Sequence, residues 1–507
     1  MFKRILIANR GEIAVRVMRA CRDLGVESVA VFSEADRAAL HVRAADYAVA
    51  VGPPPARESY LNIERILAAA KATGAEAVHP GYGFFSENAG FARAVADAGL
   101  VFIGPPPGAI EKMGDKVEAR KLMAKAGVPL VPGSPGTLET EEEVRAVAKK
   151  IGFPIMLKAA AGGGGKGMRL VSDEKDLASA VRTVASEAKS SFGDGRFYVE
   201  KFVNHPRHIE VQVFADQMGE TVHVFERECS LQRRHQKVVE ESPSPFITPE
   251  MRRAMGEVAV KAARAVNYVG AGTVEFLADA DRNFYFLEMN TRIQVEHPVT
   301  EMVTGVDLVK AQIQVAAGLP LPFHQDELAQ RGSAIECRIY AEDPTAGFVP
   351  APGRIDTLRF PEGPGIRVDA GVYEGSEVSL YYDPMIAKLV AWGRDRGEAI
   401  NRMRRALAEC TIAGELTTNL AFHRWVVEQP RFLTGDFDTN FINEEYHPEA
   451  LARGEDPTRL AALLAVAVTA QRNQNHTAAA PGATTAGANA GSASAWKTLG
   501  RLEMLRR

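Results

Sequence analysis

Four consecutive glycines at residues 162–165, in "LKAAAGGGGKGMRL", separate an apolar segment ending in Lys158 from a second apolar run. Glycine has no side chain, so such a loop can bring backbone N–H groups close to a phosphate. A lysine beside an apolar run needs an anionic partner if it is buried. The pattern is not a Walker A loop, because Lys166 is followed by Gly167 rather than Ser or Thr. We predict a strand–loop–strand hairpin whose tip folds over phosphates, in preference to a loose surface loop.

A second group of reactive residues lies within residues 270–301, where Glu275 and Glu288 each occupy a strand-like apolar run. Asn290 follows, and then Arg292, Gln294 and Glu296 in alternation. Two carboxylates and an amide oxygen on adjacent strands suit Mg²⁺, a hard cation that shares oxygen ligands with nucleotide phosphates. Either carboxylate alone could be an exposed edge residue, but the pair and the charges after it favour a metal site.

The third group is "ERECSLQRRHQKVVEESPSP", residues 226–245. Within 11 residues it gathers Arg227, Arg233, Arg234, His235 and Lys237. A solvated run of charge is the usual explanation of such a stretch. The absence of helical alternation and the Pro-rich end favour instead a fixed loop directed at an anion.

The elements that must position these residues follow from the hydrophobic pattern. Strand-like runs alternate with helical patterns over the first hundred residues, which predicts βαβ units and a parallel sheet with helices on both faces. The first turn, "ANRGE", lacks G-x-G-x-x-G, so a dinucleotide site is not expected there. We expect an α/β and α+β fold with a Rossmann-like domain and linker helix, a glycine-loop lid subdomain, a mixed domain and a tail, over residues 1–130, 131–203, 204–447 and 448–507.

Composition excludes several classes of protein. The 60 basic and 64 acidic residues give a net charge of −4, which argues against a nucleic-acid binder or a binder of anionic membranes. Four scattered cysteines fit a reducing, cytoplasmic location. The apolar run from Leu460 is shorter than the roughly 18 residues that span a bilayer. We therefore expect a soluble protein.

Read together, these stretches resemble the ATP-grasp superfamily, and within it the biotin carboxylases of biotin-dependent acyl-CoA and pyruvate carboxylases. The resemblance runs from residue 1 to about residue 445 and includes "IANRGEIAVR", "HPGYGFFSEN", "MGDK", "QRRHQKVVEE", "EMNTRIQVEHPVTE" and "ECRI". It implies a ligase in which ATP phosphorylates bicarbonate, the carboxyphosphate yields CO₂ and phosphate, and N1′ of biotin is carboxylated. The implied ligands are ATP, Mg²⁺ or Mn²⁺, bicarbonate and biotin on a carrier protein.

The resemblance also assigns roles to residues by position. ATP would bind Lys116, Lys158, Gly163, Gly164, Gly165, Lys166, Gly167, Glu200, Lys201, Val203, His208, Gln232, His235 and Leu277. Mg²⁺ would be held by Glu275, Glu288 and Asn290. Bicarbonate would meet Lys237, Arg292, Gln294 and the Val295 backbone, with Glu296 as the base that deprotonates it. Arg338 would stabilise the biotin enolate, with Tyr82 near the biotin ring.

The sequence lacks the Met-Lys-Met triplet of biotinyl domains, and it ends before a carboxyltransferase would fit. The resemblance therefore implies a free-standing chain, as a homodimer or within a larger complex, that works with a biotin carboxyl carrier protein and a carboxyltransferase subunit. We expect an acetyl- or propionyl-CoA carboxylase of fatty acid biosynthesis. A two-subunit pyruvate carboxylase and an inactive ATP-binding scaffold stay open, whereas a carbamoyl phosphate synthetase would not require "RIQVEHPVTE" with "ECRI".

The tail beyond residue 448 has no place in the family pattern. It holds an apolar helix candidate at 459–470, an Ala- and Gly-rich linker and the terminal "WKTLGRLEMLRR". Trp496, Leu499 and Leu502 share one face of a helix, as in a tethered docking helix. A tail whose end packs on its own domain is an equal alternative.

Overall fold

The amino-terminal part forms a parallel sheet of order β3-β2-β1-β4-β5, whose strands are β1 (Arg4–Ile7), β2 (Glu27–Ser33), β3 (Tyr47–Gly52), β4 (Ala77–His79) and β5 (Val101–Phe102). Successive residues of β1 point to opposite faces. Ile5 and Ile7 pack with α1 (Gly11–Asp23), and Leu6 packs with α3 (Ile63–Thr73) and α4 (Ala89–Asp97). The predicted parallel sheet with helices on both faces is confirmed. The remaining helices of this part are α2 (Leu40–Ala44), α5 (Pro107–Gly114) and α6 (Lys116–Lys125).

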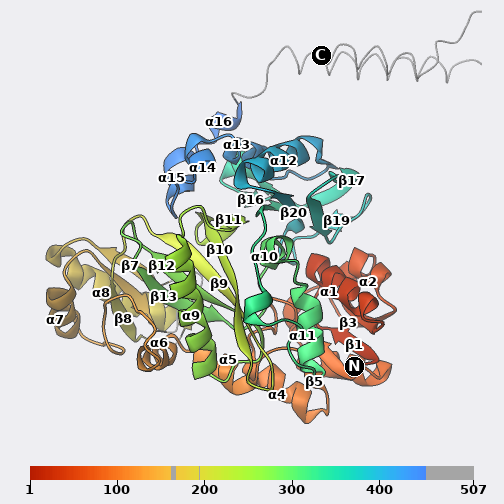
Figure 1. Ribbon diagram of the computed structural model, residues 1–507, viewed down its shortest axis with the longest axis horizontal. Coiled ribbons are helices and arrows are strands. Elements are labelled where there is room, and N and C mark those ends of the chain that lie inside the picture. Colours follow the sequence, from red (N-terminus) through yellow and green to blue (C-terminus); the bar gives the residue numbers. More distant parts are fainter. Residues whose placement is uncertain (161–166, 193–194, 453–507) are drawn as a thin grey trace, which may run out of the picture. The chain divides into compact units, whose positions relative to one another are not determined.

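The computed structural model describes residues 1–160, 167–192 and 195–452 (Figure 1). The predicted phosphate-loop residues Gly163, Gly164, Gly165 and Lys166 lie outside these ranges, as do both helix candidates of the tail. Within the described ranges, no helix is long and apolar enough to cross a membrane.

A small antiparallel sheet of order β7-β6-β8 carries the strands that flank the glycines. It consists of β6 (Ile155–Ala159), β7 (Met168–Val171) and β8 (Phe197–Lys201), and it packs against α7 (Glu141–Ile151) and α8 (Leu177–Phe192). Lys158 of β6 pairs with Met168 of β7, so the two strands form the predicted hairpin. Gly167 has a φ of 72°, a left-handed conformation that favours glycine where the chain enters β7.

The largest sheet has eight antiparallel strands in the order β13-β12-β9-β10-β11-β14-β20-β18. Their bounds are β9 (Arg207–Ala215), β10 (Thr221–Arg233), β11 (Gln236–Ser242), β12 (Gly270–Ala278), β13 (Phe284–Asn290), β14 (Ser333–Tyr340), β18 (Ile366–Ala370) and β20 (Met385–Gly393). The helix α9 (Pro249–Ala265) covers the face of β9 and β12, and α12 (Arg396–Glu409) covers the same face of β14 and β20 (Figure 1). The opposite face packs in part against α10 (His297–Thr304) and α11 (Leu308–Ala316), and the rest of it carries polar side chains.

The basic stretch at residues 226–245 is a hairpin, so the prediction of a loop there was wrong. The second half of β10 pairs with β11, and the chain turns at Arg234 and His235, which both have positive φ angles. The solvated alternative is wrong for Arg227, which is completely buried, whereas Arg234 and His235 at the turn are exposed. The many charges of this stretch are compatible with a strand because carboxylates on neighbouring strands neutralise its cations. Composition alone does not reveal these partners.

The remaining elements complete the carboxyl-terminal part. The helices are α10 (His297–Thr304), α11 (Leu308–Ala316), α13 (Leu420–Val426), α14 (Pro430–Thr434), α15 (Phe441–Glu445) and α16 (Glu449–Ala452). The short strands are β15 (Glu342–Asp343), β16 (Val349–Pro350), β17 (Gly353–Arg359), β19 (Glu377–Val378) and β21 (Thr411–Gly414). Residues 1–451 form one compact unit, and the expected boundaries near 130 and 203 within it stay predictions.

Candidate active site

The polar residues of the site come from the face of the eight-stranded sheet that is opposite to α9 and α12. In β9, residues 209, 211 and 213 pack against α9, so His208, Glu210 and Gln212 face the other way. Glu275 of β12 lies opposite both Glu210 of β9 and Glu288 of β13. Three glutamates in one row repel each other, so this face requires cations.

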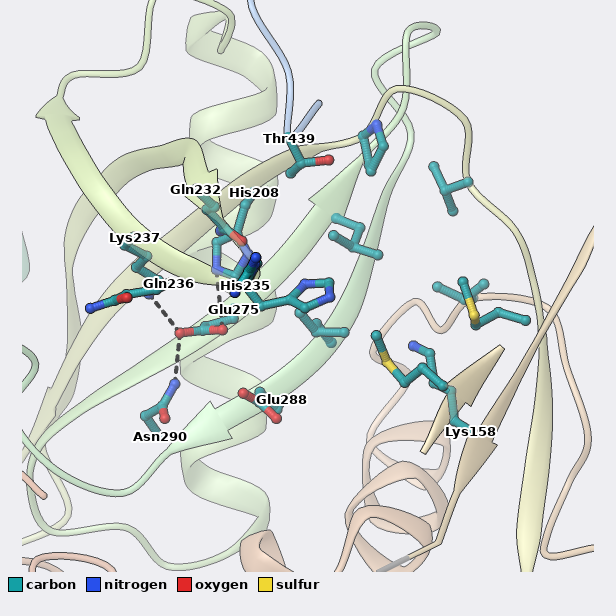
Figure 2. A pocket seen from close by; sticks show the side chains of 18 of the residues that line it. Lys158, His208, Gln232, His235, Gln236, Lys237, Glu275, Glu288, Asn290 and Thr439 are labelled. Carbon is teal, nitrogen blue, oxygen red and sulfur yellow. Dashed lines mark hydrogen bonds and ion pairs between the residues drawn. The ribbon is translucent and has the colours of Figure 1, made fainter. Parts of the chain in front are cut away.

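A pocket of about 560 Å³ opens between this face and the small sheet. Lys158 lies on the side of the small sheet, across from Lys237, Glu275 and Glu288 (Figure 2). The other predicted site residues in its lining are Lys116, Glu200, Lys201, Val203, His208, Gln232, His235, Leu277, Asn290, Arg292, Gln294, Val295, Glu296 and Arg338. The structure thus brings together residues that are up to 222 positions apart, from Lys116 to Arg338.

Lys237 is the central cation of the site. Its Nζ donates to Glu275 Oε1 at 2.8 Å, to Glu296 Oε1 at 2.6 Å and to Glu210 (Figure 2 shows the bond to Glu275). Burial alone raises the pKa of a carboxyl, but Lys237 reverses this effect and holds the pKa values of Glu275 and Glu296 below their ordinary values. Both carboxylates are therefore ionised at neutral pH.

Glu296 receives a second cation, because Arg338 donates from NH2 to its other oxygen at 2.9 Å. The same guanidinium donates from Nε to Glu240 Oε1 at 2.5 Å. Burial raises the pKa of Glu240 to about 7, with Arg338 opposing the rise. An ionised carboxylate held between two cations at a pocket wall has the protonation state that a general base requires.

Gln294 is oriented by Arg227, whose side chain is fully buried. Arg227 donates from NH2 to Gln294 Oε1 at 2.7 Å, which leaves the Gln294 amide nitrogen to donate to Glu275 Oε1 at 2.8 Å. The other N–H groups of Arg227 donate to Gln212, Thr273, Thr300 and Glu210. Arg227 therefore acts inside the protein, and it is not the anion ligand that the basic stretch indicated.

Glu275, Glu288 and Asn290 form an oxygen-rich corner that fits a divalent cation. The charge of Glu275 adds to burial in raising the pKa of Glu288, and the closest ammonium, that of Lys116, stays 3.7 Å away. Asn290 donates to Glu275 at 2.8 Å and accepts from Arg292 at 3.2 Å. Glu288, whose ammonium counter-charge is 3.7 Å away, faces the ionised Glu275, and two such carboxylates suit a hard cation with oxygen ligands.

The opposite end of the pocket combines apolar walls with one buried ion cluster. Val131, Met156, Met168 and Leu287 line it beside the predicted Leu277. Glu200 accepts hydrogen bonds from both Lys158 and Arg120. These cations overcome the effect of burial and lower the pKa of Glu200. Lys158 thus has the anionic partner that a buried lysine requires.

Models of known protein families match three consecutive parts of the chain. The matched residues are 1–110 (biotin carboxylase, N-terminal domain), 115–324 (carbamoyl-phosphate synthase L chain, ATP binding domain) and 336–444 (biotin carboxylase C-terminal domain). The biotin carboxylase of Nostoc sp. is 55% identical over 443 residues, covering 87% of this chain and 99% of that protein. The chain belongs to the biotin carboxylase family.

Other members of the biotin carboxylase family differ in the complex they serve. A pyruvate carboxylase subunit of Methanothermobacter thermautotrophicus is 54% identical, covering 88% of this chain and 90% of that protein. The crystal structure of a biotin carboxylase–β,γ-ATP complex from Campylobacter jejuni has a TM-score of 0.85 at 48% identity, covering 88% of this chain and 99% of that one. The biotin carboxylase domain of a Hydrogenobacter thermophilus 2-oxoglutarate carboxylase, in complex with MgADP and bicarbonate, has a TM-score of 0.84 at 48% identity, covering 88% and 98%.

Two residues expected from the biotin carboxylase pattern are missing from the lining that the structure describes. They are Tyr82 and Gly167, of which Gly167 directly precedes the lining residue Met168. The Tyr82 hydroxyl donates to Glu12, a buried residue of α1. The role of Tyr82 beside biotin stays a prediction, as do the individual roles of the residues that line the pocket.

Sequence reasoning missed four carboxylates and cations that hold the site. Glu210 and Glu240 pair with Lys237 and Arg338. Glu87 accepts from Arg292 Nε at 3.0 Å, and Arg120 pairs with Glu200. The alternation in "HIEVQV" could have identified Glu210 as a residue on a polar face. No local pattern marks Arg120, whose partner is 80 residues away.

Proposed function

We propose that this chain is an ATP- and Mg²⁺-dependent biotin carboxylase that couples bicarbonate to biotin carried on a separate protein. The observation that carries the proposal is the ionised Glu296, held between Lys237 and Arg338 at the wall of one pocket. A reaction that begins with removal of a proton from bicarbonate needs such a base among cations that retain the resulting anion.

The residues of the pocket divide the work by their charge. Lys237, Arg292 and Gln294 bind bicarbonate while Glu296 accepts its proton. Lys116 and Lys158 neutralise the phosphates, and the apolar walls beside Leu277 enclose the adenine. Arg338 stabilises the negative charge on the enolate of biotin once the carboxyl group is ready for transfer. A cation bound by Glu275, Glu288 and Asn290 would supply charge neutralisation at the transferring phosphoryl group.

The purified chain should hydrolyse ATP only when bicarbonate and Mg²⁺ are both present, and free biotin should stimulate the reaction. The coupling arises because the phosphoryl acceptor is the anion that Glu296 prepares. Release of inorganic phosphate, measured with each component omitted in turn, tests this directly. ATP turnover that does not respond to bicarbonate would show that the chain has another activity.

Glu288→Gln should raise the Mg²⁺ concentration required for half-maximal turnover by about tenfold, since it removes one charged ligand and keeps the shape of the side chain. Titration of Mg²⁺ at saturating ATP measures the shift. Asp279→Asn, in the turn after β12, is the matched control because it removes a carboxylate outside the pocket. Equal metal requirements in all three proteins would move the metal site elsewhere.

We further propose that the carrier and the carboxyltransferase are separate chains, that the protein forms a homodimer, and that it acts in the cytoplasm. The four cysteines are all free and buried, which suits a reducing compartment. Our first choice of parent complex is an acetyl- or propionyl-CoA carboxylase of fatty acid biosynthesis. The propionyl-CoA carboxylase alpha chain of Ruegeria pomeroyi is 52% identical over 466 residues, covering 88% of this chain and 68% of that protein.

A pyruvate carboxylase is the second candidate, because the Methanothermobacter protein is just as similar. The pocket serves the half-reaction that these complexes share, so the acceptor is selected on another chain. Co-purification of the native complex, followed by assays with acetyl-CoA, propionyl-CoA and pyruvate, distinguishes the candidates. The proposed docking helix at the end of the tail would be tested in the same complex, by truncation after residue 450.

A further inference from the structure

A fully buried lysine, Lys388, lies next to the candidate site on the same face of the sheet. Lys388 of β20 is 0% exposed and stands opposite Arg338 of β14. The neighbouring residues Ala387 and Leu389 belong to the core under α12, so Lys388 points to the other face of the sheet. On that face Val390, two positions further along, packs against α10. Lys388 therefore shares the face of Arg338 without lining the pocket.

The Lys388 ammonium makes one hydrogen bond and lies near two carboxylates. Nζ donates to the backbone oxygen of Val295 at 2.9 Å. It also lies 3.2 Å from Glu12 Oε2 and 3.9 Å from Asp369 Oδ2. The two carboxylates neutralise its charge, as a buried cation requires. The hydrogen bond to Val295 concerns the site directly, because Val295 belongs to the segment that holds Glu296, the proposed base.

Val295 directly precedes Glu296, the N-cap residue of α10. The bond from Lys388 therefore fixes the peptide unit that leads into the base. Arg227 holds the neighbouring Gln294 from the side of β10. The short segment before α10 is thus held by two fully buried cations, Arg227 at Gln294 and Lys388 at Val295.

Glu12 extends this arrangement to the amino-terminal part. It lies in the first turn of α1, is 4% exposed, and accepts a hydrogen bond from the Tyr82 hydroxyl on Oε1. One carboxylate therefore connects Tyr82 to the ammonium that holds Val295. The fit is close, because a Cβ placed on Gly371 after β18 would lie 2.6 Å from the Glu12 backbone nitrogen.

We propose that Lys388 and Glu12 are positioning residues for the reaction: Lys388 sets the Val295–Glu296 peptide in place for the base, and Glu12 fixes Tyr82 against the same ammonium. The proposal rests on the proposed function for the meaning of the site, but not for the contacts themselves. It predicts that the buried pair of Lys388 and Glu12 keeps the bicarbonate end of the pocket aligned with the end where biotin would enter.

The experiment compares the full-length protein with Lys388→Met and Glu12→Gln. Lys388→Met should lower kcat and raise the KM for bicarbonate by about tenfold each, because a charge-assisted bond to the Val295 carbonyl is lost. Glu12→Gln retains an acceptor for Tyr82 but weakens the hold on Lys388, so it should raise the KM for free biotin severalfold. The KM for ATP should stay within about twofold in both variants, since neither residue lines the pocket.

Amide hydrogen exchange of residues 295–297 gives a readout without substrate. Exchange there should be about tenfold faster in Lys388→Met, because the peptide has lost its anchor. Arg252→Met is the matched control: it breaks the pair of Arg252 with the buried Glu226, Nε to Oε2 2.8 Å, away from the site. This control should lose stability without any change in KM or in exchange at residues 295–297.

The proposal is overturned if the two variants behave like Arg252→Met, with lower stability but unchanged KM values and unchanged exchange at residues 295–297. If Lys388→Met does not fold, Glu12→Gln decides alone, and an unaltered KM for biotin overturns the proposal. Failure of the proposed function looks different. In that case the unmodified protein itself shows no bicarbonate-dependent turnover, whereas the exchange experiment still reports on the Lys388 contact.

Discussion

Glu296→Gln is expected to lower bicarbonate-dependent ATP turnover by about 10²- to 10⁴-fold while ATP binding is retained. The substitution removes the base and preserves the shape of the side chain. The fold should persist, because Lys237 keeps Glu210 and Glu275 as partners and Arg338 keeps Glu240. Steady-state turnover and a direct measurement of nucleotide affinity on the same preparation test both halves of the expectation.

Glu241→Gln provides a matched control for that experiment. Glu241 is a buried carboxylate of the neighbouring strand β11 that pairs with Arg396 at 2.7 Å and does not line the pocket. Each folded molecule of this variant should turn over ATP at the unmodified rate. Turnover that survives in Glu296→Gln would assign the base to another carboxylate, such as Glu240, which shares Arg338 with Glu296.

Lys237→Met is expected to have the second large effect, because it removes the cation shared by three carboxylates. Breaking a buried ion pair by removing one partner costs about 3–5 kcal/mol of folding free energy. Turnover should also be lost, since the substitution removes a bicarbonate ligand. Denaturant unfolding at neutral pH measures the loss of stability, and phosphate release measures the activity. A variant as stable as the unmodified protein would mean that the three carboxylates do not depend on Lys237.

The stability of Lys237→Met should depend on pH through the ionisation of Glu296. In the unmodified protein Lys237 and Arg338 outweigh burial and lower its pKa, so its contribution to stability is present above the ordinary carboxyl pKa and is lost only as pH falls through the lower value. Without Lys237 that pKa rises toward its ordinary value. The stability deficit of Lys237→Met should therefore be largest at neutral pH and shrink in acid. Any residual turnover should fall off at a higher pH than in the unmodified protein.

Local patterns predicted part of the site, whereas most of the other site residues were expected from the resemblance to the biotin carboxylases. The glutamates at 275 and 288 were predicted on adjacent strands from the apolar runs around them, and the register places them opposite each other. The glycine stretch likewise predicted paired flanking strands, which β6 and β7 form. The loop predicted at 226–245 was wrong, since alternating charges there belong to a hairpin whose partners come from elsewhere in the chain.

The amino-acid sequence by itself indicated the fold class through its short-range periodicity, and its resemblance to the biotin carboxylases indicated the family and most of the residues that line the pocket. What only the tertiary structure decided is which charges neutralise one another. Lys237 and Glu296 are 59 residues apart, and Arg338 and Glu240 are 98 apart. Burial makes each of these pairings obligatory, since an isolated charge is too costly in the interior. No local sequence pattern identifies the partner of a buried cation, because any carboxylate that the fold brings near it could neutralise its charge.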